Sequence, residues 1–162
     1  MNQTYLILGS NIGDRSSYLA EARALIKKGV GSIQSVSSIY ETEPWGKKKQ
    51  HYFLNQALLV TTSLTAQQLI VHLQSIEERM GRLKREKWGH REIDIDILFF
   101  NDEVITDDNL IIPHPHISKR QFVLAPLAEI APQFVHPIAE ATIQELLERC
   151  TDTSAVSIQK TF

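Results

Sequence analysis

We predict an α+β fold for this chain, with an antiparallel sheet and helices packed on one of its faces. Three observations support the prediction. Stretches with strand-like and helix-like periodicity follow one another in the order β-α-β-β-α-β. The length of 162 residues suits one domain with one hydrophobic core. No internal repeat and no linker rich in Pro, Gly or Ser interrupts the chain, so we predict a single domain over residues 1–162.

The first three elements are a strand, a helix and a strand. Residues 3–9 favour a strand that ends at the turn-forming run 9–14. Asp14 is suited to cap a helix that closes near Gly29. The apolar face of this helix is formed by side chains at helical spacing, namely Tyr18, Ala22, Leu25 and Ile26. Residues 33–40 favour the second strand.

The next three elements are a strand, a helix and a strand. Residues 52–62 favour a third strand, and one of its faces carries Phe53, Asn55, Ala57 and Leu59. Thr65 is suited to cap a second helix that ends at Gly81. The apolar face of this helix consists of Leu69, Leu73, Ile76 and Met80. Residues 93–100 favour a fourth strand.

The order βαββαβ is typical of a ferredoxin-like core. The fourth strand turns at Asn101 and Asp102. The C-terminal additions are a further strand, a Pro/His loop at 113–116 and a helix at 142–150. This architecture hosts many activities, so function has to be inferred from particular side chains.

Composition excludes several classes of protein. The net charge of −2 and the pI of about 6.3 argue against a general nucleic-acid surface. The single cysteine, Cys150, excludes an intramolecular disulfide framework and a multi-cysteine metal site. Neither a basic leader nor an apolar run of membrane-spanning length is present in the sequence. We therefore expect a cytoplasmic monomer that binds neither nucleic acid nor membranes.

Local charges are far less balanced than the total. Residues 82–91 hold five Arg or Lys and one Glu, a local charge of +4. Residues 92–108 hold seven Asp or Glu and no Lys or Arg, a local charge of −7. Such clusters often form plain solvated faces. Their adjacency also indicates a site for metal cations together with a phosphate-bearing anion.

Asp94 and Asp96 are the sharpest feature of the acidic segment. In a strand their side chains share one face, with Cα atoms about 6.6 Å apart. The opposite face would enter the core through Ile93, Ile95, Ile97 and Phe99. Two carboxylates at this spacing can bind a pair of hard cations such as Mg²⁺. The same pattern also fits two solvated acids on a half-exposed strand.

The basic segment offers partners for phosphate oxygens. Its cations are Arg82, Lys84, Arg85, Lys87 and Arg91, and guanidinium groups match phosphate oxygens in pairs. Trp88 supplies a planar surface for a heterocycle or, alternatively, a cover for the core. Gly81 precedes the segment, Gly89 lies near its end, and both would let it close over a phosphoryl donor. Lys119 and Arg120 could reach the same site.

Residues 87–98, KWGHREIDIDIL, resemble the signature of the 6-hydroxymethyl-7,8-dihydropterin pyrophosphokinase family. The likeness extends over essentially the whole chain, with further motifs in the family's order and spacing. These motifs are Gly9-Ser10-Asn11 with Gly13-Asp14, residues 40–46, Phe53-Leu54-Asn55, Gln74 with Glu77, Gly81-Arg82, Pro113-His114-Pro115, Arg120 with Phe122-Val123-Leu124, and residues 126–132.

The resemblance implies a reaction and its cofactors. The family transfers the β,γ-pyrophosphoryl group of ATP to the hydroxymethyl oxygen of the pterin, which yields AMP and the pterin diphosphate for folate biosynthesis. ATP is then the co-substrate, two Mg²⁺ ions are the cofactors, and the partners are small molecules. Transfer of this kind requires positioning and charge neutralisation more than a nucleophilic side chain, which agrees with the acidic pair and the basic segment.

The resemblance also implies roles for individual residues. The catalytic residues would be Arg82, Arg91, Asp94 and Asp96, and the two aspartates would hold the metal ions. The ATP-binding residues would be Gln74, Glu77, Arg85, Trp88, Arg91, His114 and Arg120. The pterin-binding residues would be Thr42, Pro44, Trp45, Gly46, Phe53, Asn55, Trp88 and Phe122. In this set, Asn55 would read the pterin edge, and Phe53 and Phe122 would sandwich the ring.

Some of these positions have plainer interpretations. Phe53 and Phe122 also suit ordinary core packing, and Gln74 and Glu77 also suit a solvated helix face. The sequence departs from the family pattern at His90, where a small residue or Pro is typical, and at His51, where Pro often follows Gln50. Either Lys84 or Arg85 could be the second phosphate contact of the basic segment.

Two other classes of function also fit parts of the sequence. A two-metal phosphodiesterase would use Asp94, Asp96, His114 and His116. An RNA-binding module would use the basic segment, but the aromatic-rich strand motif for base stacking is missing. The Walker-type loop, the dinucleotide-binding glycine motif, the nucleophile elbow and the H-E-x-x-H motif are also missing from the sequence.

Overall fold

The computed structural model describes residues 1–42, 52–81 and 92–159. Within them, the first half of the chain forms β1 (Asn2–Ser10), α1 (Arg15–Gly29), β2 (Gly31–Val36), β3 (Tyr40–Thr42), β4 (Phe53–Thr62) and α2 (Ala66–Arg79). The second half forms β5 (Asp94–Phe100), β6 (Ile105–Asp107), β7 (Leu110–Ile112), a short 3₁₀ turn η1 (Ile117–Lys119), α3 (Gln121–Ile130), α4 (Ile143–Arg149) and β8 (Val156–Ile158).

The main sheet is antiparallel throughout. Its strand order is β5-β1-β4-β3-β8, and β2 pairs with the other part of β4. The predicted α+β class and the βαββαβ order are therefore confirmed, with β1, β2, β4 and β5 as the four core strands. Strand β1 lies between β4 and β5, so residues at the end of β1 have neighbours on both sides.

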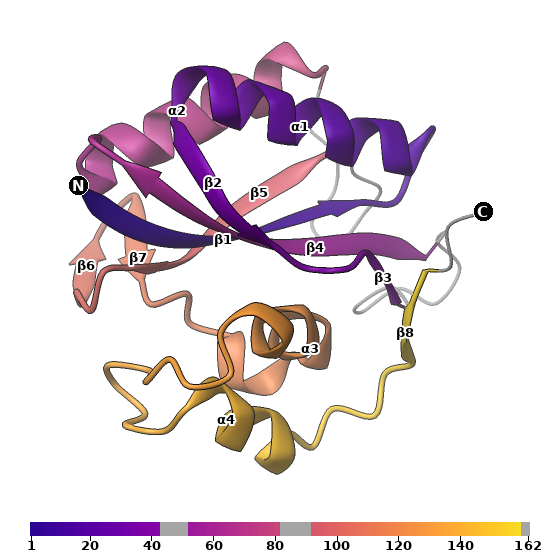
Figure 1. Cartoon of the computed structure of the whole chain (residues 1–162), viewed down its shortest axis with the longest axis vertical. Helices are drawn as coiled ribbons and strands as arrows, with labels where there is room; N and C mark the ends of the chain where they lie inside the picture. Colours follow the sequence, from indigo (N-terminus) through magenta and orange to yellow (C-terminus); the bar gives the residue numbers. More distant parts are fainter. Residues whose placement is uncertain (43–51, 82–91, 160–162) are drawn as a thin grey trace.

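Helices cover both faces of this sheet (Figure 1). The prediction of helices on one face holds for α1 and α2 of the core, whereas α3 and α4 lie against the opposite face. Two apolar clusters reflect this arrangement. One contains Leu6 and Leu8 of β1 with side chains of α1 and α2, and the other contains Ile7 with side chains of α3 and α4.

Helices α1 and α2 begin at the predicted caps, and α4 begins directly after Thr142, where its start was predicted. The Asp14 carboxylate accepts a hydrogen bond from the backbone N–H of Ser17. Thr65 and Thr142 each form a capping box with the residue three positions later. Gly81 has a φ of +84° after the C-cap of α2, a conformation that glycine adopts without strain.

The predicted strand over 33–40 is divided in the structure. Strand β2 ends at Val36, and β3 begins at Tyr40. The side chain of Ser37 explains the break, because its Oγ accepts a hydrogen bond from the backbone N–H of Ala57 and so replaces a backbone acceptor. Both strands still pair with β4.

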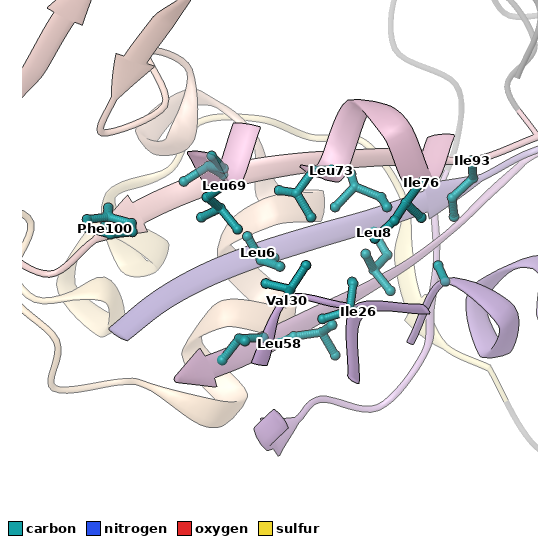
Figure 2. Packing of buried hydrophobic residues seen from close by; sticks show 14 of the residues in the cluster. Leu6, Leu8, Ile26, Val30, Leu58, Leu69, Leu73, Ile76, Ile93 and Phe100 are labelled. Carbon is teal, nitrogen blue, oxygen red and sulfur yellow. The ribbon is translucent and has the colours of Figure 1, made fainter. Parts of the chain in front are cut away.

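Ile93, Ile95 and Ile97 lie in the α1/α2 cluster, as predicted. Figure 2 shows Ile93, Leu8 and Leu6 near the side chains of α2. Phe99 is the exception, because a register shift between Tyr5 and Leu6 turns it to the α3/α4 side. Phe100 takes the expected place in the α1/α2 cluster.

The C-terminal part differs most from the prediction. The single added strand is a hairpin of β6 and β7, and neither α3 nor β8 was predicted. Pro126 lies inside α3, where a proline removes a backbone donor and argues against a helix. None of the helices in the described ranges combines the length and apolar character needed to cross a membrane.

Candidate active site

The ends of three neighbouring strands bring the polar residues of the site together. Gly9 on β1 pairs with Asn55 on β4 and with Asp94 on β5. Ile7 pairs with Ala57 and with Asp96 in the same way. Ile7 and Ala57 belong to the α3/α4 cluster, and side chains two apart in a strand share a face. Asn55, Asp94 and Asp96 therefore lie on the face that α3 covers.

The aspartate pair is more accessible than its neighbours. Asp94 is half-buried and Asp96 is exposed, while Ile95 between them is buried on the opposite face. The backbone N–H of Ile95 donates a hydrogen bond of 2.8 Å to Oε2 of Glu77 on α2. This contact holds the centre of the Asp94–Asp96 segment against α2.

The donor set of this pair suits a hard cation. Carboxylate oxygens are the ligands that Mg²⁺ prefers, and such sites usually keep positions for water and substrate phosphates. Across residues 1–42, 52–81 and 92–159, no group of three or more His, Cys, Asp or Glu side chains is arranged to hold a metal. In this part of the chain, His114 and His116 thus do not complete the ligand set that the phosphodiesterase alternative requires.

Thr42 and Asn55 form a buried polar pair beside the aspartates. Asn55 is 4% exposed, and its Nδ2 donates a hydrogen bond of 2.8 Å to Oγ1 of Thr42. Thr42 pairs with Phe53 across β3 and β4, and Phe53 is only partly buried. An amide next to an accessible ring can recognise the polar edge and the flat face of a heterocycle.

The absence of a side chain at Gly9 leaves room for the Asn55 amide. A Cβ atom at Gly9 would lie 2.9 Å from Oδ1 of Asn55 and 3.6 Å from Cδ1 of Phe53. The first distance is shorter than van der Waals contact, so any side chain at this position would displace the amide.

His114 is held in a neutral form. Its backbone N–H donates to the carbonyl of Leu98, and its Nδ1 accepts from the backbone N–H of His116 at 3.2 Å. Burial, together with the charges of Arg120 and His116, lowers the pKa of His114 to about 4. With Nδ1 acting as an acceptor, the proton of the neutral ring is assigned to Nε2, which can donate to an anion.

Arg120 and Phe122 lie together at the start of α3. The guanidinium carbon of Arg120 is 5.6 Å from the centroid of the Phe122 ring. Burial lowers the pKa of Arg120, whereas the negative charges of Asp96 and Asp152 act in the opposite direction. A guanidinium that is partly removed from water and faces Asp96 is suited to phosphate oxygens.

Gln74 and Glu77 differ in environment although they share one stretch of α2. Gln74 is exposed, but Glu77 is only 7% exposed. The solvated-face interpretation therefore fails for Glu77. The structure gives Glu77 a supporting contact with β5.

Several predicted site residues lie outside the described residues. They are Pro44, Trp45, Gly46, Arg82, Arg85, Trp88 and Arg91, together with the departures at His51 and His90 and the alternative contact Lys84. The described site therefore consists of the aspartate pair, the Thr42–Asn55 pair with Phe53, and the group around His114, Arg120 and Phe122.

Sequence reasoning assigned no role to Glu129, Tyr40 or Asp152. The Glu129 carboxylate accepts hydrogen bonds from Oη of Tyr40 and from the backbone N–H of Ser38, both at 2.7 Å. These bonds tie α3 to the start of β3. Burial raises the pKa of Tyr40, and the hydrogen bond to the charged Glu129 raises it further. Glu129 and Tyr40 lie in motifs that the resemblance includes, which is the signal that could have identified them. Asp152 gives no such signal.

The comparison with family models agrees with this arrangement. Residues 5–132 match the model described as 7,8-dihydro-6-hydroxymethylpterin-pyrophosphokinase (HPPK). The matched range includes all described residues of the site.

Two curated pyrophosphokinases are similar to the chain over most of their length. The chain is 44% identical over 145 residues to a 2-amino-4-hydroxy-6-hydroxymethyldihydropteridine pyrophosphokinase of Aquifex aeolicus, covering 90% of each protein. It is 46% identical over 160 residues to the protein of the same name from Bacillus subtilis, covering 98% of this chain and 91% of the relative.

Solved structures show the same fold. Wild-type HPPK-DHPS of Plasmodium falciparum with STZ-DHP superposes with a TM-score of 0.76 at 22% identity. The match covers 91% of this chain and 43% of the Plasmodium chain, so this chain spans less than half of that protein.

Proposed function

Because the chain belongs to the 7,8-dihydro-6-hydroxymethylpterin-pyrophosphokinase family, it is an ATP-dependent diphosphotransferase of folate synthesis, and we propose that its acceptor is 6-hydroxymethyl-7,8-dihydropterin. The hydroxymethyl oxygen attacks the β-phosphorus of ATP. The bond from that phosphorus to the oxygen bridging it to the α-phosphorus breaks, and AMP leaves. The products are AMP, the pterin diphosphate and the proton released from the hydroxyl group.

The aspartate pair and the basic side chains have different roles in binding the triphosphate. Asp94 and Asp96 would hold two Mg²⁺ ions, which neutralise phosphate charge when bound. Arg120 binds phosphate oxygens from the α3 side, and neutral His114 donates from Nε2. The predicted contacts Arg82, Arg85 and Arg91 lie outside the described residues, and we propose that they complete this set.

The pterin binds between β4 and α3. The carbonyl oxygen and the NH2 group of the Asn55 amide both form hydrogen bonds with the polar edge of the pterin. Phe53 and Phe122 contact the two faces of the ring. The buried pair of Asn55 with Thr42 supports this role, because it fixes the orientation of the amide before the pterin arrives. Gln74 and Glu77 were expected to line the nucleotide side. The contact of Glu77 with β5 favours a supporting role for it instead.

The placement of Asn55 and Asp94 on either side of Gly9 carries this proposal. It puts the amide that we propose to recognise the heterocycle next to the carboxylates that we propose to bind cations, on one face of one sheet. The distance between the acceptor hydroxyl and the transferred phosphate must be short, and neighbouring strands satisfy that requirement.

Product analysis tests the proposal directly. The purified protein is incubated with ATP, Mg²⁺ and 6-hydroxymethyl-7,8-dihydropterin, and nucleotides are separated by chromatography. We expect AMP and pterin diphosphate in equal amounts, no AMP without pterin, and loss of activity with EDTA that excess Mg²⁺ reverses. Formation of ADP, or ATP hydrolysis that does not depend on the pterin, would contradict the proposal.

A further inference from the structure

The segment after α4 (residues 150–159, called here the C-terminal segment) begins on the side of the sheet that carries the candidate site and ends beside β3. Figure 1 shows it running from α4 past α3 to β8, which lies beside β3. It follows the range 5–132 that the family model matches. Two sets of contacts connect this segment to elements that carry site residues.

The first set of contacts is made by Asp152 at the start of α3. Oδ2 of Asp152 accepts a hydrogen bond of 3.0 Å from the backbone N–H of Gln121, the first residue of the helix. The residue at the N-cap position is Arg120, whose side chain makes no capping hydrogen bond. Asp152 thus supplies from a distant part of the chain the acceptor that a local Ser, Thr or Asp normally provides.

The carboxylate of Asp152 is itself held in place. Its Oδ1 accepts a hydrogen bond of 3.0 Å from the backbone N–H of Ser154. Burial acts to raise the pKa of Asp152, but the hydrogen bonds from Ser154 and Gln121 and the charge of Arg120 outweigh it, so the pKa lies below its ordinary value. Asp152 is therefore ionised at neutral pH, as an acceptor at a helix start and a partner for a guanidinium should be.

The charge of Asp152 acts on the same guanidinium as the charge of Asp96, one of the two aspartates proposed to hold metal ions. Asp96 and Asp152 both favour the charged form of Arg120, whereas burial opposes it. The positive charge of Arg120 is thus stabilised by the carboxylate of Asp96 on the sheet and by that of Asp152 in the C-terminal segment. Its neighbour in the site, Phe122, is in the first turn of α3, next to the residue that Asp152 caps.

The second set of contacts holds β3. Strand β8 pairs with β3, with Val156 opposite Thr42 and Ile158 opposite Tyr40. The backbone N–H of Gln159 also donates to the carbonyl of Ile39 at 2.7 Å. The same segment therefore contacts the strand of Thr42 and the helix start of Arg120 and Phe122.

We infer that Asp152 is a positioning residue of the active site, which fixes Arg120 and Phe122 by capping α3 from the C-terminal segment. This inference rests on the proposed function for the roles of Arg120 toward ATP and of Phe122 toward the pterin. Asp152 itself touches neither substrate. Its effect is to hold the two side chains in the binding geometry before the substrates arrive.

Variants of the full chain test this inference. Asp152→Ala removes both acceptor oxygens, whereas Asp152→Asn keeps one acceptor and the shape of the side chain. Thr153→Ala is the matched control, since Thr153 is an exposed neighbour of Asp152 in the same segment. Steady-state kinetics are measured well below the unfolding midpoint of each variant. Hydrogen exchange of the Gln121 and Phe122 amides is followed in parallel.

Asp152→Ala should raise the KM for ATP and for the pterin by about five- to tenfold, the range that loss of a helix cap implies, with a smaller change in kcat. It should also speed exchange of the Gln121 and Phe122 amides but not of amides in β1. Asp152→Asn should show smaller changes than Asp152→Ala in the KM values and in amide exchange. Thr153→Ala should match the parent in both measurements.

A second comparison uses Arg120. If Asp152 acts through Arg120, Asp152→Ala should raise the KM for ATP less in an Arg120→Ala background than in the parent. Unchanged KM values and unchanged exchange in Asp152→Ala would overturn the inference. A parent protein that forms no AMP would contradict the proposed function instead, and the exchange measurement would still decide whether Asp152 holds the start of α3.

Discussion

The missing side chain at Gly9 determines where the Asn55 amide can lie. Because a Cβ atom would come within 2.9 Å of Oδ1, Gly9→Ala should turn the amide and break its hydrogen bond with Thr42. We expect the KM for the pterin to rise about tenfold or more, while the KM for ATP changes little, since recognition of polar edges depends strongly on paired hydrogen bonds. Steady-state kinetics with each substrate varied in turn measure the two constants.

Gly29→Ala controls for the intrinsic effect of replacing glycine. A Cβ atom at Gly29, the last residue of α1, meets nothing within 4 Å. This variant should keep both KM values and fold at least as stably as the parent. Equal increases in the two KM values of Gly9→Ala would show that the substitution acts on the whole sheet and not on the amide.

Substitution of the aspartate pair should affect turnover instead of substrate affinity. Asp94→Asn and Asp96→Asn each remove one negative charge and keep the size of the side chain. Turnover should fall by orders of magnitude in each variant, because charge neutralisation dominates this kind of transfer. The fold should persist, as measured by far-ultraviolet circular dichroism and thermal unfolding.

Asp107→Asn, on exposed β6, is the control for the change in net charge. It should leave turnover unchanged. Near-normal turnover in either Asp94→Asn or Asp96→Asn would refute the assignment of the metal ions to this pair.

Single residues were predictable where chemistry depends on spacing along the chain. Asp94 and Asp96 share a face because strands have a period of two, and the sequence shows that period directly. The contact of Asn55 with Thr42 and the room above Gly9 depend on the register of three strands, which no local pattern records. Asp152 was missed for a similar reason, because it caps a helix that begins 31 residues earlier in the chain.

The link between α2 and β5 is the main contact at the level of elements. The buried Glu77 carboxylate accepts the backbone N–H of Ile95, between the two aspartates. Glu77→Leu would leave that donor without its acceptor, at a cost of about 1–3 kcal/mol in the free energy of unfolding. Turnover should fall as well, because the Asp94–Asp96 segment loses its support. Urea unfolding and product formation measure the two effects.

Glu77→Gln is the matched variant, since its amide oxygen can still accept from Ile95. It should retain more stability and more turnover than Glu77→Leu. Gln74→Leu, on the exposed part of the same helix, should leave stability nearly unchanged. If Glu77→Leu were as stable as the parent, the hydrogen bond to Ile95 would have no role in holding β5.

Elements with complete local signals were predicted well, and those without them were missed. Helices α1, α2 and α4 have side-chain caps at Asp14, Thr65 and Thr142, and their predicted starts are correct. Helix α3 has no side-chain cap of its own and contains Pro126. Strand β8 is three residues long and owes its place to pairing with β3. Long-range contacts form these two elements, so the local sequence could not reveal them.

The whole molecule divides at the sheet, and the site belongs to the α3/α4 side. The βαββαβ core with α1 and α2 supplies the strands, whereas α3 and the C-terminal segment supply the cover with Arg120 and Phe122. Two histidines with lowered pKa values, the half-buried His114 and the buried His136, also lie on this side. The stability of this side should therefore depend on pH more than that of a core without such groups.

His136 shows why protonation opposes folding. Its Nδ1 accepts hydrogen bonds from the backbone N–H groups of Ile138 and Ala139, so a proton on Nδ1 would break both. Burial lowers the pKa of His136, and the pKa of His114 is lowered to about 4. The unfolded chain takes up these protons near pH 6.5, before the folded chain does. Stability from both groups is present above pH 6.5 and is lost as the pH falls toward the folded-state values.

Urea unfolding at pH 7 and pH 5 measures this loss. His114 alone should reduce the free energy of unfolding by about 2 kcal/mol between these pH values, and His136 should add to it. His136→Asn and His114→Asn keep a side-chain acceptor but do not titrate, so each should lose less stability on acidification than the parent. The double variant should lose least. An equal loss in the parent and the double variant would contradict the assignment of this acid sensitivity to His114 and His136.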